Sequence, residues 1–256
     1  MSSRRLLSLF LGLALLSADA ATAGDPPIPT AHMRQTIQGW TIQVDDRLLE
    51  GEHREVGARA LRLLEDRLFE IALILPADKV NRLRKVPIWL DATHGSLKSM
   101  QYHPSAGWLK GHGFSEALEK CVHIPDAAQF ASPRHHHQQP WAVLHELAHA
   151  YHDQVLDFEH AEVRAAWERV REGGRFEKVR HIDGHDTKHY ALTNQKEFFA
   201  EMTEAYFGLN DFFPFHRADL KQAEPEVFAL MKSIWGEVPH DRREPKGATP
   251  ASAAAP

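Results

Sequence analysis

Two histidines and a glutamate within five consecutive residues form the clearest chemical pattern in the sequence. His145-Glu146-Leu147-Ala148-His149 has the form H-E-x-x-H. On a helix, residues four positions apart project from the same side, so the imidazoles of His145 and His149 can bind one Zn²⁺ ion together. Glu146 then lies beside the open coordination position, where its carboxylate can take a proton from a metal-bound water. The pattern predicts a metal site with a general base.

The residues around this motif favour a helix. Leu144, Leu147, Ala148 and Tyr151 recur at helical spacing and can bury one stripe. Pro140 stands where the first turn of a helix tolerates proline. The alternative is a surface helix that carries two solvated histidines. A third metal ligand from elsewhere in the chain would decide between the two.

Three sources of a third ligand compete. The extended pattern H-E-x-x-H-x-x-G-x-x-H fails, because His152 and Val155 occupy the positions of its glycine and its last histidine. A polar loop at residues 181–189 offers Asp183, Asp186 or a nearby histidine. Ligands on a loop without regular spacing are harder to hold in place.

The third source is Glu197, on a predicted helix over residues 194–208. Glu197, Glu201 and Glu204 fall on one face of that helix. A helix beside the metal-binding helix could offer Glu197 as a ligand, and Glu201 could accept the outer N–H of a ligating imidazole. The alternative is an acidic face exposed to solvent, which the helix taken alone favours.

The segment from Tyr190 to Glu201 resembles part of a known enzyme family. Its sequence, Tyr-Ala-Leu-Thr-Asn-Gln-Lys-Glu-Phe-Phe-Ala-Glu, is similar to a segment of the anthrax lethal factor-like zinc metallopeptidases. In that family Tyr…Thr-Asn-x-x-Glu-Phe-Phe-Ala-Glu follows an H-E-x-x-H helix. Both motifs occur here in the same order and at similar separation, and the resemblance extends from about Trp141 to Tyr206.

The resemblance implies a zincin-like fold and a role for each matched residue. One zinc ion per chain would be bound by His145, His149 and Glu197, with Glu146 as the base. Tyr190 would place its hydroxyl near the developing oxyanion, and Glu201 would hold a ligating imidazole. Substrate choice does not follow from the resemblance, because it depends on surface outside the matched segment.

We therefore expect an exported zinc-dependent endopeptidase that hydrolyses peptide bonds of a peptide or protein substrate. The principal alternative is a non-catalytic exported module with a zincin fold that binds metal or another protein, which the 18 histidines of the chain motivate. A zinc hydrolase acting on a non-peptide amide would need the same site, and the sequence does not separate it from a peptidase.

Composition narrows the class of protein. The 256 residues suffice for one sizeable domain or two small ones, and the net charge of −5, with acids and bases interspersed, predicts no nucleic-acid partner. Residues 1–23 have the basic start, short apolar run and small-residue cleavage sites of a secretory signal, so we expect export after cleavage near Ala20 or Ala23. The apolar run is short for a membrane span, so none is expected in the mature chain, although an uncleaved anchor is the rival interpretation.

The remaining pattern predicts an α+β domain over residues 31–237, with a small twisted sheet packed on the helices that carry the metal site. A linker at 24–30 precedes it and a disordered tail at 238–256 follows. Strands are expected at 36–44, 86–90 and 121–124. The last has two interpretations, a strand that borders the substrate cleft and an ordinary edge strand. One helix is expected to end near Pro76, and others are expected over 140–153, 158–172, 194–208 and 225–235. Residues 91–113 are expected to form a loop.

Two histidine-rich segments and one cysteine remain. His135, His136 and His137 form a short run without the fixed geometry of a specific metal site, so a structural or solvated role is expected. A second ion at residues 181–189 stays open. Cys121 is the only cysteine, which precludes an internal disulfide and predicts a small buried side chain.

Overall fold

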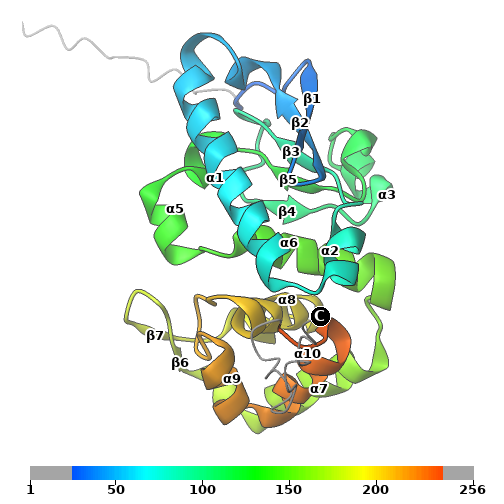
Figure 1. Cartoon of the computed structure of the whole chain (residues 1–256), viewed down its shortest axis with the longest axis vertical. Coiled ribbons are helices and arrows are strands. Elements are labelled where there is room, and N and C mark those ends of the chain that lie inside the picture. Colours follow the sequence, from blue (N-terminus) through cyan, green and yellow to red (C-terminus); the bar gives the residue numbers. More distant parts are fainter. Residues whose placement is uncertain (1–24, 239–256) are drawn as a thin grey trace, which may run out of the picture.

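The computed structural model describes residues 25–238, which form an α+β fold as expected (Figure 1). The expected signal peptide lies outside the described residues, and so does all of the expected tail except Val238, whose side chain is buried. Residues 25–30 contain no helix or strand. Within the described part of the chain, no helix is both long and apolar enough to cross a membrane.

A five-stranded mixed sheet lies in the first half of the chain. Its strands are β1 (His32–Ile37), β2 (Trp40–Asp45), β3 (Ile88–Leu90), β4 (Gln101–Tyr102) and β5 (Val122–Ile124). They are ordered β1-β2-β3-β5-β4 across the sheet. Strands β2, β3 and β5 are parallel, whereas β1 and β4 run antiparallel to their neighbours and form the two edges. The expected sheet is therefore present.

The expected single strand at 36–44 is wrong, because the chain reverses in its middle. Gln38 and Gly39 both have positive φ, 51° and 88°, which is the geometry of the tight turn that joins hairpin strands. The turn separates β1 from β2, and β2 carries Trp40, Ile42 and Val44 into the core. Gln-Gly is a weaker hairpin signal than Asn-Gly or Asp-Gly, so the reversal was missed.

Helices cover the sheet and continue beyond it (Figure 1). The helices of the sheet half are α1 (Arg54–Ile74), α2 (Ala77–Leu83), α3 (Ala106–Gly111), α4 (Ala127–Phe130) and α5 (Pro133–Gln138). The second half contains α6 (Ala142–Tyr151), the π-helical turn η4 (His152–Leu156), α7 (Ala161–Gly173), α8 (Gln195–Phe207), α9 (Arg217–Ala223) and α10 (Pro225–Trp235), with the hairpin β6 (Val179–Arg180) and β7 (Asp186–Thr187). Figure 1 shows α6 between the sheet and the C-terminal helices, with α8 alongside it.

One apolar core joins these layers. Helix α1 buries Leu64, Leu68 and Ile71 in the same cluster as the inward side chains of the sheet, α6 and α8. Such burial is the main driving force for folding, at roughly 25 cal/mol per Å² of apolar surface. Cys121 is buried, as expected, in a smaller cluster with Leu109 and Leu118. The packed core fixes α6 and α8 relative to the sheet.

Two features of the sheet differ from expectation and bear on the site. Strand β5 lies between β3 and β4, so it is neither an edge strand nor the border of a cleft. The residues expected to be loop at 91–113 contain β4, which forms that edge, and helix α3. Two residues are too few for a periodic pattern, which is why β4 could not be seen in the sequence.

Candidate metal centre

Helix α6 presents the histidines of the H-E-x-x-H motif to a cavity and its apolar side to the core. Leu144, Leu147 and Ala148 are completely buried, whereas the side chains of His145 and His149 each remain 12% exposed. Their rings meet edge to face with centroids 4.7 Å apart. The expected helix is present, and burial of its apolar stripe turns both imidazoles to the same side.

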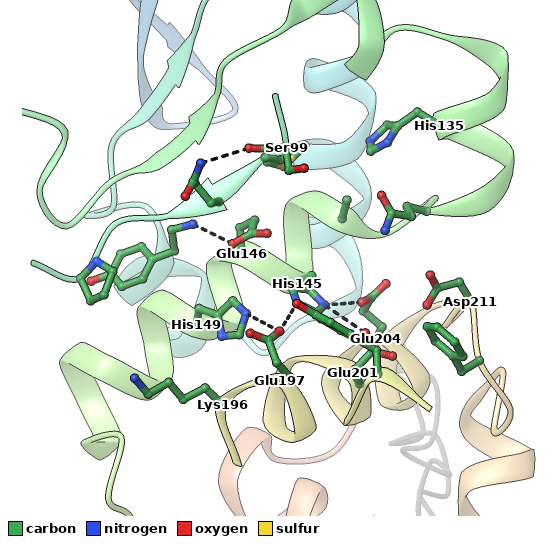
Figure 2. Close-up of a pocket in the computed structure, with 18 of the residues that line it drawn as sticks. Ser99, His135, His145, Glu146, His149, Lys196, Glu197, Glu201, Glu204 and Asp211 are labelled. Carbon is green, nitrogen blue, oxygen red and sulfur yellow. Dashed lines mark hydrogen bonds and ion pairs between the residues drawn. The ribbon is translucent and has the colours of Figure 1, made fainter. Parts of the chain in front are cut away.

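Helix α8 brings the third group of the site. Asn194 caps this helix: its side chain accepts hydrogen bonds from the backbone N–H groups of Lys196 and Glu197. The cap places Glu197 in the first turn, where its Oε2 lies 3.2 Å from Nε2 of His145 and 3.2 Å from Nε2 of His149. Figure 2 shows this carboxylate between the two imidazoles.

The acidic face of α8 is directed at α6 rather than at solvent. Glu201 is 3% exposed and Glu204 is 4% exposed, so the alternative of a solvated acidic face is wrong. Oε1 of Glu204 lies 2.7 Å from Nδ1 of His145, whereas Oε1 of Glu201 lies 3.7 Å from the same nitrogen. The hydrogen bond expected from Glu201 is thus made by Glu204, one turn further along the helix.

Glu146 is held by the edge strand. Its Oε2 accepts a hydrogen bond of 2.7 Å from the backbone N–H of Tyr102 in β4. Burial raises the pKa of Glu146, and the carboxylate of Glu197 acts in the same direction. A carboxylate with a raised pKa is a better proton acceptor near neutral pH. The strand that sequence analysis missed therefore positions the expected base.

These groups line a cavity of about 670 Å³. Tyr190, in the short helix η6 (Tyr190–Leu192), lines it with a side chain that is 47% exposed. Burial raises the pKa of Tyr190, and Glu197 adds to the effect, so its phenol keeps the proton at neutral pH. Lys196 also lines the cavity (Figure 2). All six site residues expected from the sequence line one cavity, although Glu201 lies 3.7 Å from Nδ1 of His145 and does not form the expected hydrogen bond.

The histidines and glutamates of this cluster change one another's pKa values. Burial opposes charge on His145, but the carboxylates of Glu197 and Glu204 raise its pKa well above the ordinary value. Burial likewise opposes ionisation of Glu197, but hydrogen bonds to the two histidines hold its pKa well below its usual range. A divalent cation between His145, His149 and Glu197 would neutralise the negative charge that protons on the histidines neutralise in its absence.

Two further carboxylates lie on one side of the cavity. Burial raises the pKa of Glu201 well above its usual value, and the nearby Asp211 and Glu204 add to the rise. Burial also raises the pKa of Asp211 to about 7, reinforced by Glu204. Oε2 of Glu201 has no hydrogen-bond partner among the described residues. This side of the cavity can take up protons in a pH range where ordinary carboxyl groups cannot.

The polar loop at 181–189 does not contribute the third ligand. His181, Asp183 and His185 form a separate cluster in which Asp183 contacts both imidazoles, at 2.7 Å for His181. His181 lines the cavity, and its Nε2 lies 4.0 Å from Asp211. Of the histidine triplet, His135 is buried and lines the cavity, but none of the three joins a potential metal-ligand group in the described chain.

The residues present fit a zinc ion. Zinc is typically bound tetrahedrally by imidazole nitrogens and carboxylate oxygens at about 2.0–2.1 Å, which places ligand atoms roughly 3.3 Å apart. The separations from Glu197 Oε2 to both imidazole nitrogens, 3.2 Å each, match this spacing. Glu204 supplies the outer hydrogen bond that metal-binding histidines almost always make.

Comparison of the chain with protein-family models, with curated proteins and with solved structures finds no match.

Proposed function

We propose that the protein is a zinc-dependent endopeptidase with a zincin-like fold. The observation that carries the proposal is the convergence of His145, His149 and Glu197, with ligand atoms 3.2 Å apart, beside Glu146 in a cavity of about 670 Å³. Two imidazoles and one carboxylate that leave a position open are the donor set of catalytic zinc. The resemblance of the segment from Tyr190 to Glu201 to lethal factor-like peptidases supports the same conclusion.

His145, His149 and Glu197 would hold the zinc ion. When bound, zinc supplies a Lewis acid that polarises a carbonyl oxygen and lowers the pKa of water. The hydrogen bond from Nδ1 of His145 to Glu204 fixes the ring with Nε2 toward Glu197, and it would make that nitrogen a better ligand. Glu204 thus orients a ligand and does not touch substrate.

Glu146 would be the general base. The backbone N–H of Tyr102 holds one of its oxygens at 2.7 Å, which leaves the other free to face a water in the cavity. Glu146 accepts a proton as that water attacks the peptide carbonyl and then passes it to the leaving amine. Its raised pKa suits both halves of this transfer.

Tyr190 would stabilise the transition state. Its side chain lines the cavity, and its raised pKa keeps the hydroxyl protonated, so the O–H can donate a hydrogen bond to the oxygen that becomes negative during attack. A single donor of this kind typically contributes about 3 kcal/mol.

The edge of the sheet offers a place for the substrate backbone. Ser99, Met100, Gln101 and Tyr102 line the cavity, and β4 pairs with β5 on its other side. An extended peptide can add to such an edge as a further strand through main-chain hydrogen bonds other than that of the Tyr102 N–H, which Glu146 accepts, and these bonds do not depend on its side chains. This placement brings a peptide carbonyl past Glu146 and favours an endopeptidase over a hydrolase of small amides.

The proposal includes export of the mature chain, on the basis of the signal-like sequence at residues 1–23.

Cleavage of a mixed peptide library by the zinc-loaded mature chain tests the proposal. We expect the wild type to generate new peptide termini. This cleavage should stop when zinc is removed and resume when zinc is restored. Residues flanking the cuts would define the substrate. If the zinc-loaded chain cuts no peptide bond in the library or in unfolded proteins, the peptidase proposal fails, and the non-catalytic metal-binding module becomes the better account.

A further inference from the structure

A second group of potential metal ligands lies inside the sheet, away from the residues that line the cavity. Asp91 directly follows β3, His94 lies in the loop after it, and His123 is the middle residue of β5. Asp91 and His123 are completely buried and His94 is 4% exposed. None of the three lines the cavity that contains the H-E-x-x-H motif.

The ligand-type atoms of these residues converge on one point. Oδ2 of Asp91 lies 2.6 Å from Nδ1 of His94 and 2.8 Å from Nε2 of His123. The three atoms all lie within 4.8 Å of one another. Parallel strands β3 and β5 present their side chains at the same end of the sheet, which is why residues 32 positions apart meet there.

An outer layer of histidines holds this group in place. Nε2 of His32, in β1, lies 2.7 Å from Oδ1 of Asp91, the oxygen that does not face the other two histidines. Nε2 of His103, just after β4, lies 3.2 Å from Nδ1 of His123. Bound metals characteristically have such partners, because a hydrogen bond to the far atom of each ligand fixes its orientation.

The carboxylate of Asp91 is the centre of this group. The imidazoles of His94 and His123 lie at hydrogen-bond distance from its Oδ2, and that of His32 lies at hydrogen-bond distance from its Oδ1. A buried carboxylate needs such partners, and a bound cation would be a further one.

We propose that Asp91, His94 and His123 form a second, buried site for a divalent transition-metal ion of the zinc type. Two imidazoles and one carboxylate suit Zn²⁺ and similar ions, whereas Ca²⁺ and Mg²⁺ prefer sites made of oxygen atoms alone. Ligand atoms around zinc lie roughly 3.3 Å apart, so the Asp91 oxygen has to withdraw from the two nitrogens by roughly half an ångström. A water would complete the coordination, because the second oxygen of Asp91 is held by His32.

The ion in this site is structural. Its ligands come from β5 and from the segment that directly follows β3, and the outer histidines come from β1 and from the residue after β4. It therefore ties the strands of the sheet together at one end. His103 directly follows Tyr102, whose N–H holds Glu146, so the buried ion also supports the edge strand of the proposed catalytic cavity. Its occupancy does not depend on whether that cavity hydrolyses peptides.

Metal content distinguishes the two sites. The full mature chain is saturated with zinc, freed of excess metal on a desalting column, and analysed for zinc per chain by mass spectrometry. The wild type is compared with His94→Ala, with His149→Ala and with the double variant that carries both substitutions. The control is His137→Ala, at an exposed histidine outside the potential metal-ligand groups of the described chain, which should keep the zinc content of the wild type. We expect His94→Ala and His149→Ala each to lose one ion relative to the wild type, and the double variant to lose two.

A wild-type zinc content that His94→Ala leaves unchanged would overturn the buried site and make the group a hydrogen-bonded network. Loss on His94→Ala without loss on His149→Ala would support the buried site while contradicting zinc in the cavity. If His94→Ala fails to fold, crystals of the zinc-loaded wild type decide. Anomalous scattering at the zinc edge among Asp91, His94 and His123 supports the site, and its absence there in crystals with zinc at His145 overturns it.

Discussion

Oε1 of Glu204 lies 2.7 Å from Nδ1 of His145, whereas the carboxylate of Glu201, one turn earlier on α8, comes no closer to that nitrogen than 3.7 Å. Both glutamates are buried, so burial alone does not distinguish them. The hydrogen bond makes Glu204 the residue that orients the ring of His145, and with it the nitrogen that we propose as a metal ligand.

This difference predicts unequal effects of two matched substitutions. Glu204→Gln should weaken zinc binding by roughly 10- to 100-fold, because it removes the charged partner of a ligating imidazole. Glu201→Gln should change zinc affinity much less. Competition with a zinc chelator of known affinity measures both. Equal losses in the two variants would show that the general negative charge of α8, and not this hydrogen bond, supports the site.

Glu197 should be required for zinc to stay in the cavity. Glu197→Ala removes one of three ligands and should release zinc during desalting, whereas Lys196→Ala, the adjacent residue of the same cavity, should retain it. Zinc held in the proposed buried site would add to the zinc measured per chain. Each variant is therefore also made in the His94→Ala background, in which that site is removed. If the double variant Glu197→Ala/His94→Ala retained as much zinc as His94→Ala alone, Glu197 would not be a zinc ligand.

Tyr190 should act in turnover and not in metal binding. Tyr190→Phe deletes the hydroxyl alone and should lower kcat roughly 10²- to 10³-fold, as removal of one oxyanion donor does. KM and zinc content should stay close to those of the wild type. Steady-state kinetics on a substrate taken from the library cuts measures this. An unchanged kcat would leave Tyr190 as a residue of the cavity wall.

Acid should destabilise the fold partly through His152. This side chain is completely buried between Phe158 and Phe199, and neither ring nitrogen has a hydrogen-bond partner in the described part of the chain. Burial lowers its pKa to about 3, against an unfolded value of 6.5. Between these values the unfolded chain binds a proton that the folded chain does not, so stability is full above pH 6.5 and falls as the pH decreases.

His152→Leu should remove this contribution. The free energy of unfolding of the variant relative to the wild type should rise by about 1.4 kcal/mol for each pH unit below 6.5. Urea denaturation at pH 7, 6 and 5 measures the difference. His103 and His189, whose pKa values burial also lowers to about 3, remain in both proteins and cancel in the comparison. A difference that does not vary with pH would show that His152 gains a proton in the folded state.

The helices that carry the site were predictable because their signals are local. The apolar stripe of α6 and the Asn194 cap of α8 each lie within a few residues of the chemistry they position. Glu197 meets His145 and His149 only because α6 and α8 pack together. Glu197 and His145 are 52 positions apart in the sequence, so the residues alone left this contact open. Glu204 was grouped with Glu197 and Glu201, but only packing decides which of them reaches His145.

The sheet was harder to predict. Its edge strand β4 has two residues, and its hairpin turn at Gln38 and Gly39 lacks the usual asparagine or aspartate. The contact between Tyr102 and Glu146 joins residues 44 positions apart through a backbone N–H, which no side-chain pattern encodes. The group around Asp91 likewise arises from strand order, and its histidines show no common spacing in the sequence.

The most direct test of the central claim compares turnover by Glu146→Gln and the wild type at equal zinc content. Glutamine keeps the size of the side chain and can still accept the hydrogen bond from Tyr102, but it cannot take up the proton. The proposed mechanism predicts that the wild type cleaves its peptide substrate, while Glu146→Gln retains its zinc and loses roughly 10²- to 10⁴-fold or more in rate. Equal cleavage by both proteins would contradict the claim that Glu146 is the base of a zinc peptidase.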